Sequence, residues 1–176
     1  LYSGTNGMAG EAGHIRLAEN GPVGYGKAGS FEGFCSGGGI AQLGQMMAEE
    51  ALDREEIPSF CQSKGELFKV NARTIAEAAE KGDPLALKIY DIVADRLGQG
   101  LAILVDLLNP EKIVIGSIFL RQEKFLRQRM EKILNKEALE QSLSVVEVLP
   151  AGLGEKLGDY AAVSVGLRAY QKKQKG

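Results

Sequence analysis

Residues 10–14 read Gly-Glu-Ala-Gly-His, and residues 21–32 read Gly-Pro-Val-Gly-Tyr-Gly-Lys-Ala-Gly-Ser-Phe-Glu. These two stretches hold the only histidine of the chain, His14, two carboxylates, Glu11 and Glu32, and six of the 23 glycines. Glycine permits positive φ and lets a ligand or a second backbone approach closely. The stretches are therefore interpreted either as a ligand-binding loop or as a set of tight turns, and spacing alone leaves both open.

Composition is that of a soluble globular protein. The chain has 176 residues, of which 44% are hydrophobic and 25% charged, and its formal net charge is −2. This length suits one domain or a large piece of one, and the mild acidity offers no electrostatic footprint for nucleic acid. No apolar run approaches the roughly 20 residues of a membrane span. We therefore expect a cytoplasmic protein that does not use this part of the chain to bind a membrane or nucleic acid.

Two cysteines, Cys35 and Cys61, are too few and too far apart for a metal cage or a disulfide framework. We expect both to be reduced thiols. The chain begins at Leu1 and not at a methionine, so removal of an upstream segment and a natural start at Leu1 both stay open.

The apolar periodicity predicts a helix-rich chain. Asp83-Pro84 is a strong helix start, because aspartate caps an amino terminus and proline suits the first helical position. Glycines interrupt two predicted helices: those at 37–39 suggest a backbone or a ligand lying against the helix, while Gly98 and Gly100 suggest a kink or a close helix crossing. The predicted helices cover 32–56, 71–81, 84–108, 120–134, 137–141 and a last helix capped by Asp159, and the predicted strands cover 14–17, 112–116 and 143–149.

The order of elements in the second half alternates strands and helices, which favours an α/β fold. The predicted strands are too few for a complete doubly wound sheet. The sequence therefore predicts a part of a larger α/β domain, or one lobe of a two-lobed protein.

Glu11 and His14 are three residues apart, so a tight loop can present both side chains on one side. Together a carboxylate and an imidazole can bind vicinal hydroxyls, because the carboxylate accepts hydrogen bonds and the imidazole can accept or donate them. Such paired hydrogen bonding is typical of sugar recognition. A metal site, a base with its orienting partner and a satisfied structural network remain alternatives for the same residues.

Residues 110–117 read Pro-Glu-Lys-Ile-Val-Ile-Gly-Ser and place Gly116 just past the carboxyl end of a predicted buried strand. In α/β sheets, ligands bind outside those strand ends. Gly116 is therefore a candidate contact for a flat or phosphorylated ligand, although many strands end in glycine before a turn.

Three stretches resemble the ROK family of repressors, open reading frames and sugar kinases. Residues 1–14, Leu-Tyr-Ser-Gly-Thr-Asn-Gly-Met-Ala-Gly-Glu-Ala-Gly-His, resemble the second half of the family signature. Residues 21–36 resemble the segment that follows it, and residues 109–116 resemble the family's adenosine-side strand. The resemblance implies the ribonuclease H-like, actin-like ATPase fold. It further implies that residues 1–176 form a single helix-rich C-terminal lobe, without the N-terminal lobe that carries the phosphate loop and the catalytic aspartate.

The resemblance also implies roles for individual residues. Glu11 and His14 correspond to the glutamate and histidine at the sugar hydroxyls, Glu32 to the glutamate of the next segment, and Gly116 to a glycine that contacts the nucleotide. No residue of the chain corresponds to the catalytic base. ATP and Mg²⁺ are implied as cofactors of the intact parent protein, with a hexose or amino-hexose as substrate, and we expect a homo-oligomer, a dimer.

At three positions the chain departs from the family pattern. ROK proteins usually have three cysteines that hold a structural zinc together with the histidine, and these positions read Val23, Tyr25 and Ser30 here. We therefore expect no zinc, with His14 oriented by hydrogen bonds and packing instead.

The sequence thus predicts the sugar- and nucleotide-binding portion of a ROK-type, ATP-dependent hexose kinase of the glucokinase class, inactive by itself. One alternative is the sugar-sensing lobe of a ROK transcriptional repressor, and another is a non-catalytic interaction module whose glycines are only structural. If a second lobe is missing, we expect the apolar stripe of the helix over 84–108 to be uncovered and to favour self-association.

Overall fold

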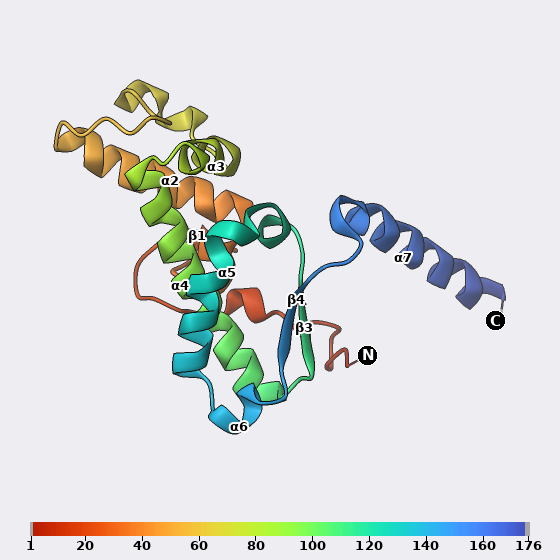
Figure 1. Cartoon of the computed structure of the whole chain (residues 1–176). Coiled ribbons are helices and arrows are strands. Elements are labelled where there is room, and N and C mark those ends of the chain that lie inside the picture. The colour runs from red at the N-terminus through yellow and green to blue at the C-terminus, as the bar shows by residue number, and fades with distance from the viewer. Residues whose placement is uncertain (1, 175–176) are drawn as a thin grey trace.

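The computed structural model describes residues 2–174, and Figure 1 shows a helix-rich body from which the last helix extends. Helices gather around α4, and β3 and β4 lie side by side along one flank of the body. In chain order the elements are η1 (Ala12–His14), β1 (Val23–Gly24), β2 (Lys27–Ala28), α1 (Phe31–Cys35), α2 (Gly37–Asp53), η2 (Lys64–Lys69), α3 (Ala72–Glu80), α4 (Pro84–Leu108), β3 (Lys112–Ile115), α5 (Ile118–Glu137), α6 (Glu140–Leu143), β4 (Glu147–Pro150), η3 (Gly154–Lys156) and α7 (Leu157–Gln174).

The long helix α4 begins and ends where the sequence predicts. The Asp83 carboxylate accepts hydrogen bonds from the N–H groups of Leu85 and Ala86, each at 2.9 Å, and thereby satisfies the first turn. At the other end Asn109 adopts the left-handed conformation that commonly closes a helix. Because α4 packs against α1, α2, α3 and α5, it forms the centre of the body.

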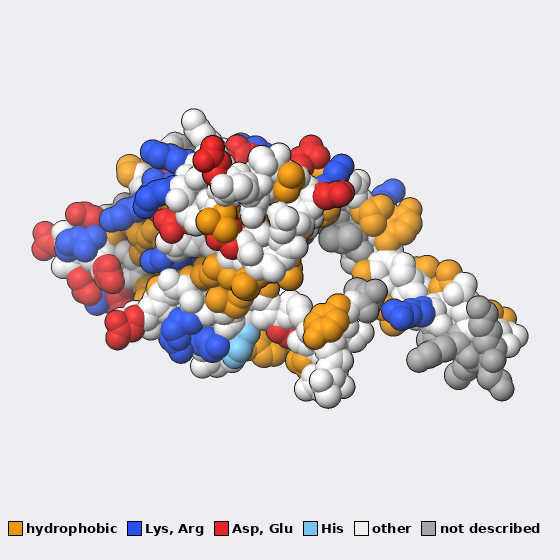
Figure 2. All heavy atoms as spheres, turned by 90° about the horizontal axis from the view of Figure 1, so that it is seen from below, with side chains coloured by type: hydrophobic (Ala, Val, Ile, Leu, Met, Phe, Trp, Pro, Cys, Tyr) orange, Lys and Arg blue, Asp and Glu red, His pale blue; other side chains and the backbone are white. Residues whose placement is uncertain are grey.

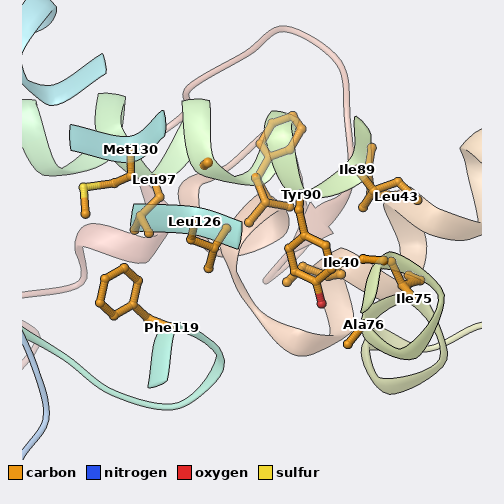
Figure 3. Packing of buried hydrophobic residues seen from close by; sticks show 14 of the residues in the cluster. Ile40, Leu43, Ile75, Ala76, Ile89, Tyr90, Leu97, Phe119, Leu126 and Met130 are labelled. Atoms are coloured by element: carbon orange, nitrogen blue, oxygen red, sulfur yellow. The ribbon is translucent and has the colours of Figure 1, made fainter. Parts of the chain in front are cut away.

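The hydrophobic core lies on both sides of α4, as Figure 3 shows. On one side Leu97 lies with Leu126 and Met130 of α5, and towards α2 and α3 the Tyr90 ring lies near Ile40. All of these side chains are buried. The expectation that the apolar stripe of α4 is uncovered is therefore wrong for most of the helix, because helices of the same chain cover it, whereas Leu108 in the last turn is 70% exposed.

Gly98 and Gly100 mark close crossings, and α4 is continuous through them. A Cβ atom on Gly98 would lie 2.6 Å from the carbonyl oxygen of Met130 in α5, and a Cβ atom on Gly100 would overlap the Phe31 ring of α1. Both approaches are far closer than ordinary van der Waals contact between carbon atoms, about 3.5–4.0 Å. The two glycines therefore let α5 and α1 pack directly against the backbone of α4.

The predicted helix over 32–56 is in fact two helices, α1 and α2, separated by Ser36. Ser36 has an extended backbone (φ −83°, ψ 160°), and its hydroxyl accepts a hydrogen bond from the N–H of Gly39 at 3.0 Å. This cap starts a new helix, as Ser30 does for α1 by accepting from Gly33 at 3.1 Å. A Cβ atom on Gly39 would overlap the Gly33 carbonyl, so a backbone and not a ligand lies against Gly39.

Strands β3 and β4 form a parallel pair with Ile113 opposite Val148, and α5 and α6 connect them. The predicted strand over 112–116 is confirmed as β3, but it is not buried as predicted, because its residues alternate between exposed and half-buried and Val114 is 61% exposed. The strand predicted over 143–149 begins later, because α6 occupies Glu140–Leu143. Together with the surrounding helices, this unit gives the helix-rich α/β fold that the sequence predicts.

The strand predicted over 14–17 is wrong. The chain forms the short turn η1 there, followed by an isolated bridge between Arg16 and Ser30. The N–H groups of Leu17 and Ala18 both donate to the carbonyl oxygen of Gly29, so no regular ladder continues. The hairpin β1–β2 pairs Val23–Gly24 with Lys27–Ala28 just beyond this bridge.

The last helix, α7, lies away from the body (Figure 1). It begins at Leu157, so Asp159 lies in its first turn and is not its cap as predicted. Within residues 2–174, none of the helices has the length and apolar character needed to cross a membrane.

Candidate functional site

The turn η1 presents Glu11 and His14 at the surface. Glu11 directly precedes the turn and His14 ends it, with the His14 N–H donating to the Glu11 carbonyl oxygen at 3.1 Å. Residues three apart in a 3₁₀ turn lie on the same side, and both side chains are exposed. Figure 2 shows the histidine at the surface, between basic and hydrophobic side chains. The geometry leaves both groups free to bind a ligand from solvent.

Glu32 lies beside the same turn, although it belongs to α1. A Cβ atom on Gly13 would lie 3.2 Å from the Glu32 Cβ and 3.5 Å from its Oε2 atom. The Glu32 side chain therefore runs along the backbone of Gly13, which stands between Glu11 and His14. The N–H of Phe31 donates to the Ile15 carbonyl oxygen at 2.8 Å and holds the start of α1 in this place.

A cavity of about 340 Å³ opens between η1, the α1–α2 junction, α4, the end of β3 and the start of α5. This volume is within the usual range of small-molecule sites, about 300–1,000 Å³. Its lining is mostly apolar, with the polar residues Glu32, Ser36 and Ser117 among it. The lining consists of Gly13, Phe31, Glu32, Cys35, Ser36, Val93, Leu97, Ile115, Gly116, Ser117, Ile118, Phe119 and Leu126.

Gly116 and Ser117 form the wall at the carboxyl end of β3. Ser117 has φ 54° and ψ −120°, a conformation that residues with a side chain rarely adopt, and such backbones cluster at ligand sites. Ser117 precedes α5 without making a side-chain cap. The first turn of α5 therefore lacks a cap from Ser117, and its residues Ile118 and Phe119 line the cavity, an arrangement that suits an anionic group.

Cys35 lines the cavity as a free thiol. Burial raises the pKa of Cys35, and the nearby Arg96 guanidinium opposes this only in part. The thiol lies 3.9 Å from the carbonyl oxygen of Val93. Because the thiolate is the reactive form, Cys35 is suited to packing and not to nucleophilic chemistry. Cys61 is also free, as predicted.

The structure therefore brings the predicted site residues together in two groups. Glu32 and Gly116 line one cavity, while Glu11 and His14 lie outside its lining, joined to it through Gly13. Within residues 2–174, no group of three or more histidine, cysteine, aspartate or glutamate side chains is placed to hold a metal ion.

Sequence reasoning missed three residues at this site, Ser117, Lys27 and Arg16. Lys27 donates from Nζ to the His14 carbonyl oxygen at 2.8 Å, and Arg16 donates to the Ala28 carbonyl oxygen at 2.8 Å. These bonds join a side chain to a main-chain carbonyl across a loop, and such contacts leave no periodic pattern in the sequence. The signal in the sequence that could have indicated the hairpin carrying Lys27 is Gly26, whose positive φ of 72° helps form its turn.

Comparisons with known proteins agree on one family. The family model of the ROK family matches residues 1–166. The chain is 30% identical over 168 residues to the DNA-binding transcriptional dual regulator NagC of Escherichia coli, covering 93% of this chain and 39% of that protein. It is 36% identical over 118 residues to a glucokinase of Halalkalibacterium halodurans, covering 66% of this chain and 34% of that protein.

A solved structure agrees with these relatives. A ROK family glucokinase from Streptomyces griseus, solved in complex with glucose and AMPPNP, matches with a TM-score of 0.65 and 26% identity. The match covers 89% of this chain and 50% of that one. The chain spans half or less of the length of each of these three proteins. Its fold is the helix-rich C-terminal lobe of the ribonuclease H-like, actin-like ATPase fold, and the chain belongs to the ROK family.

Proposed function

We propose that residues 1–176 form a single C-terminal lobe that binds a hexose or amino-hexose and a nucleotide in an ATP-dependent hexose kinase of the glucokinase class. The observation that carries this proposal is the cavity whose lining contains both Glu32 and Gly116. A hexose placed at Glu11, His14 and Glu32 would then lie next to the end of β3.

The hydroxyl groups of a sugar suit the part of the site formed by Glu11, His14 and Glu32. Carboxylates accept hydrogen bonds, and histidine can accept or donate, so the three side chains can pair with several neighbouring hydroxyls. A site built on such pairs rejects analogues that lack a hydroxyl, because a polar group is then left unpaired.

The part of the lining at the end of β3 suits a nucleotide. The glycine at the end of β3 and the uncapped start of α5 offer backbone groups to a flat or phosphorylated ligand. Mg²⁺ is usually bound through substrate phosphates with few protein ligands, and in our proposal it comes with the nucleotide. None of these described residues is assigned as the catalytic base, so in our proposal phosphoryl transfer requires a group supplied by another part of the protein.

The test is calorimetric titration of the complete polypeptide that contains these residues, with glucose, N-acetylglucosamine and AMPPNP as probes. Glu11→Gln, His14→Ala and Glu32→Gln should each raise the dissociation constant of the bound hexose at least tenfold and that of AMPPNP less than twofold. Gly116→Val should do the reverse.

Glu50→Gln is the matched control, because Glu50 is an exposed glutamate of α2. It should change neither constant. Equal losses of both ligands in the Glu11 and His14 variants would show a folding role for these residues and would refute the proposed division of the site.

A second candidate is the sugar-sensing lobe of a transcriptional repressor. It is favoured by the similarity to NagC, which extends over 93% of this chain. A complete polypeptide that binds a hexose but not AMPPNP would support this candidate over the kinase. In either case we propose a cytoplasmic homodimer in which this lobe does not contact nucleic acid, and sedimentation analysis tests the dimer.

A further inference from the structure

The positions at which ROK proteins usually hold zinc do not fit a metal in this chain. Val23 and Tyr25 are 46% and 85% exposed, and neither side chain offers a zinc ligand here. Ser30 is fully buried, and its hydroxyl is engaged as the cap of α1. His14 is the remaining candidate ligand, and one ligand does not make a site. Something other than a metal must therefore fix the loop that carries Glu11 and His14.

Hydrogen bonds to main-chain carbonyls join the two halves of this loop. From the hairpin side, Lys27 Nζ donates to the His14 carbonyl oxygen at 2.8 Å. From the turn side, Arg16 donates to the Ala28 carbonyl oxygen at 2.8 Å and to the Glu19 carbonyl oxygen at 3.4 Å. Each half thus contributes a cation that binds a carbonyl group of the other half.

The hairpin itself is fixed on the body of the protein. Gln42 of α2 binds both main-chain groups of Val23, accepting from its N–H and donating to its carbonyl oxygen, each at 3.0 Å. A Cβ atom on Gly24 would lie 2.7 Å from the N–H nitrogen of Gly33, so β1 rests directly on α1. Lys27 therefore projects from a fixed support and can position the turn that it contacts.

We infer that Lys27 is the positioning residue of the hexose site, with Arg16 in support, and that these two cations take the place of a structural metal. Lys27 acts through the peptide of His14: the His14 N–H bonds locally to Glu11, whereas its carbonyl is joined by Lys27 to a segment 13 residues away. A charged donor gives a stronger hydrogen bond than a neutral one. The expected effect of Lys27 on hexose binding rests on the proposed function. Its expected effect on the order of the loop does not.

The test uses Lys27→Met in the complete polypeptide, with two readouts. Hydrogen–deuterium exchange of the peptides that cover residues 11–17 should become at least tenfold faster, while exchange in α4 is unchanged. In titrations with glucose and N-acetylglucosamine, the dissociation constant of the bound hexose should rise about tenfold, and that of AMPPNP should stay within twofold. A purely structural lysine would alter exchange in α4 and the binding of both ligands together.

Two variants and one treatment serve as controls. Lys27→Arg keeps a charged donor and should restore most of the hexose affinity, and Lys132→Met removes an exposed lysine of α5 and should change nothing. A chelator such as 1,10-phenanthroline should leave exchange and binding of the wild type unchanged, and metal analysis should find far less than one zinc per chain.

The outcomes separate the two proposals. If the wild type binds neither hexose, the proposed function fails, and exchange in residues 11–17 still decides the role of Lys27. Unchanged exchange in Lys27→Met overturns the inference. One zinc per chain, with chelation loosening residues 11–17, overturns it as well.

Discussion

Replacement of Gly98 by alanine tests whether the close crossing of α4 and α5 stabilises the protein. The new Cβ atom would lie 2.6 Å from the Met130 carbonyl oxygen and 2.7 Å from the Ile133 Cβ. Both atoms are fixed to the helix backbone, so no side chain can simply turn away. To restore an ordinary contact, α5 must retreat by about 0.8 Å.

The retreat of α5 costs more free energy than alanine gains from its higher helix propensity. Alanine is favoured over glycine inside a helix by about 1 kcal/mol, whereas overpacking of a core costs about 1–3 kcal/mol. The retreat also loosens Leu126, Met130 and Leu134, which are at most 4% exposed. With two rigid contacts, the cost lies at the upper end of its range. We expect Gly98→Ala to lower the free energy of unfolding by about 2 kcal/mol and Tm by about 4–8 °C.

Thermal and urea unfolding of the complete polypeptide measure this difference. The matched control is Gly38→Ala in α2, because a Cβ atom there would have no neighbour within 4 Å. That variant should be as stable as the wild type or more stable by up to about 1 kcal/mol. A Gly98→Ala protein that unfolds at or above the wild-type temperature would refute the argument, since the crossing would then tolerate a methyl group.

Two further predictions concern the site and the start of α4. Gly13→Ala places a Cβ atom 3.2 Å from the Glu32 Cβ, so the glutamate must move by a few tenths of an ångström. Titration should show that the affinity for hexose falls several-fold, while Tm stays within about 2 °C of the wild type. Burial raises the pKa of Asp83, but the N–H groups of Ala86, Ser59 and Leu85 outweigh it and hold this pKa below its usual value. Its contribution to stability is therefore complete above the unfolded pKa of about 3.9 and is lost as pH falls through the lower folded pKa. Asp83→Asn keeps a capping side chain but should make the free energy of unfolding less dependent on pH below about 4. Denaturant titrations at several pH values measure this dependence. An acid dependence equal to that of the wild type would contradict the prediction.

The sequence predicts well those elements that local signals determine. The helix α4 has both bounds marked, by Asp83-Pro84 at its start and by Asn109-Pro110 at its end, and the structure confirms them. The short apolar run over 112–116, which is rich in β-branched residues and ends at a glycine, is confirmed as β3. For α4 and β3, the residues within and next to the element are sufficient to predict it.

Other features depend on contacts that no local pattern records. The break at Ser36 interrupts a helical apolar pattern, and only the cap on Gly39 and the overlap with Gly33 reveal it. The cavity draws its lining from segments between Gly13 and Leu126, which become neighbours only through folding. The roles of Glu11, His14, Glu32 and Gly116 remain predictions, which the titrations above test.

The two glycines of α4 also determine the width of the cavity. Successive helical residues are separated by about 100°, so Gly98 and Gly100 face nearly opposite directions. Gly98 determines how closely α5 approaches α4, and α5 contributes several residues to the cavity lining. Gly100 determines the position of the Phe31 ring, which also lines the cavity. A methyl group at Gly98 would displace α5 together with its lining residue Leu126, and a methyl group at Gly100 would displace the lining ring of Phe31. In this fold, substitutions at Gly98 or Gly100, which do not themselves line the cavity, can therefore change the size of the ligand that fits.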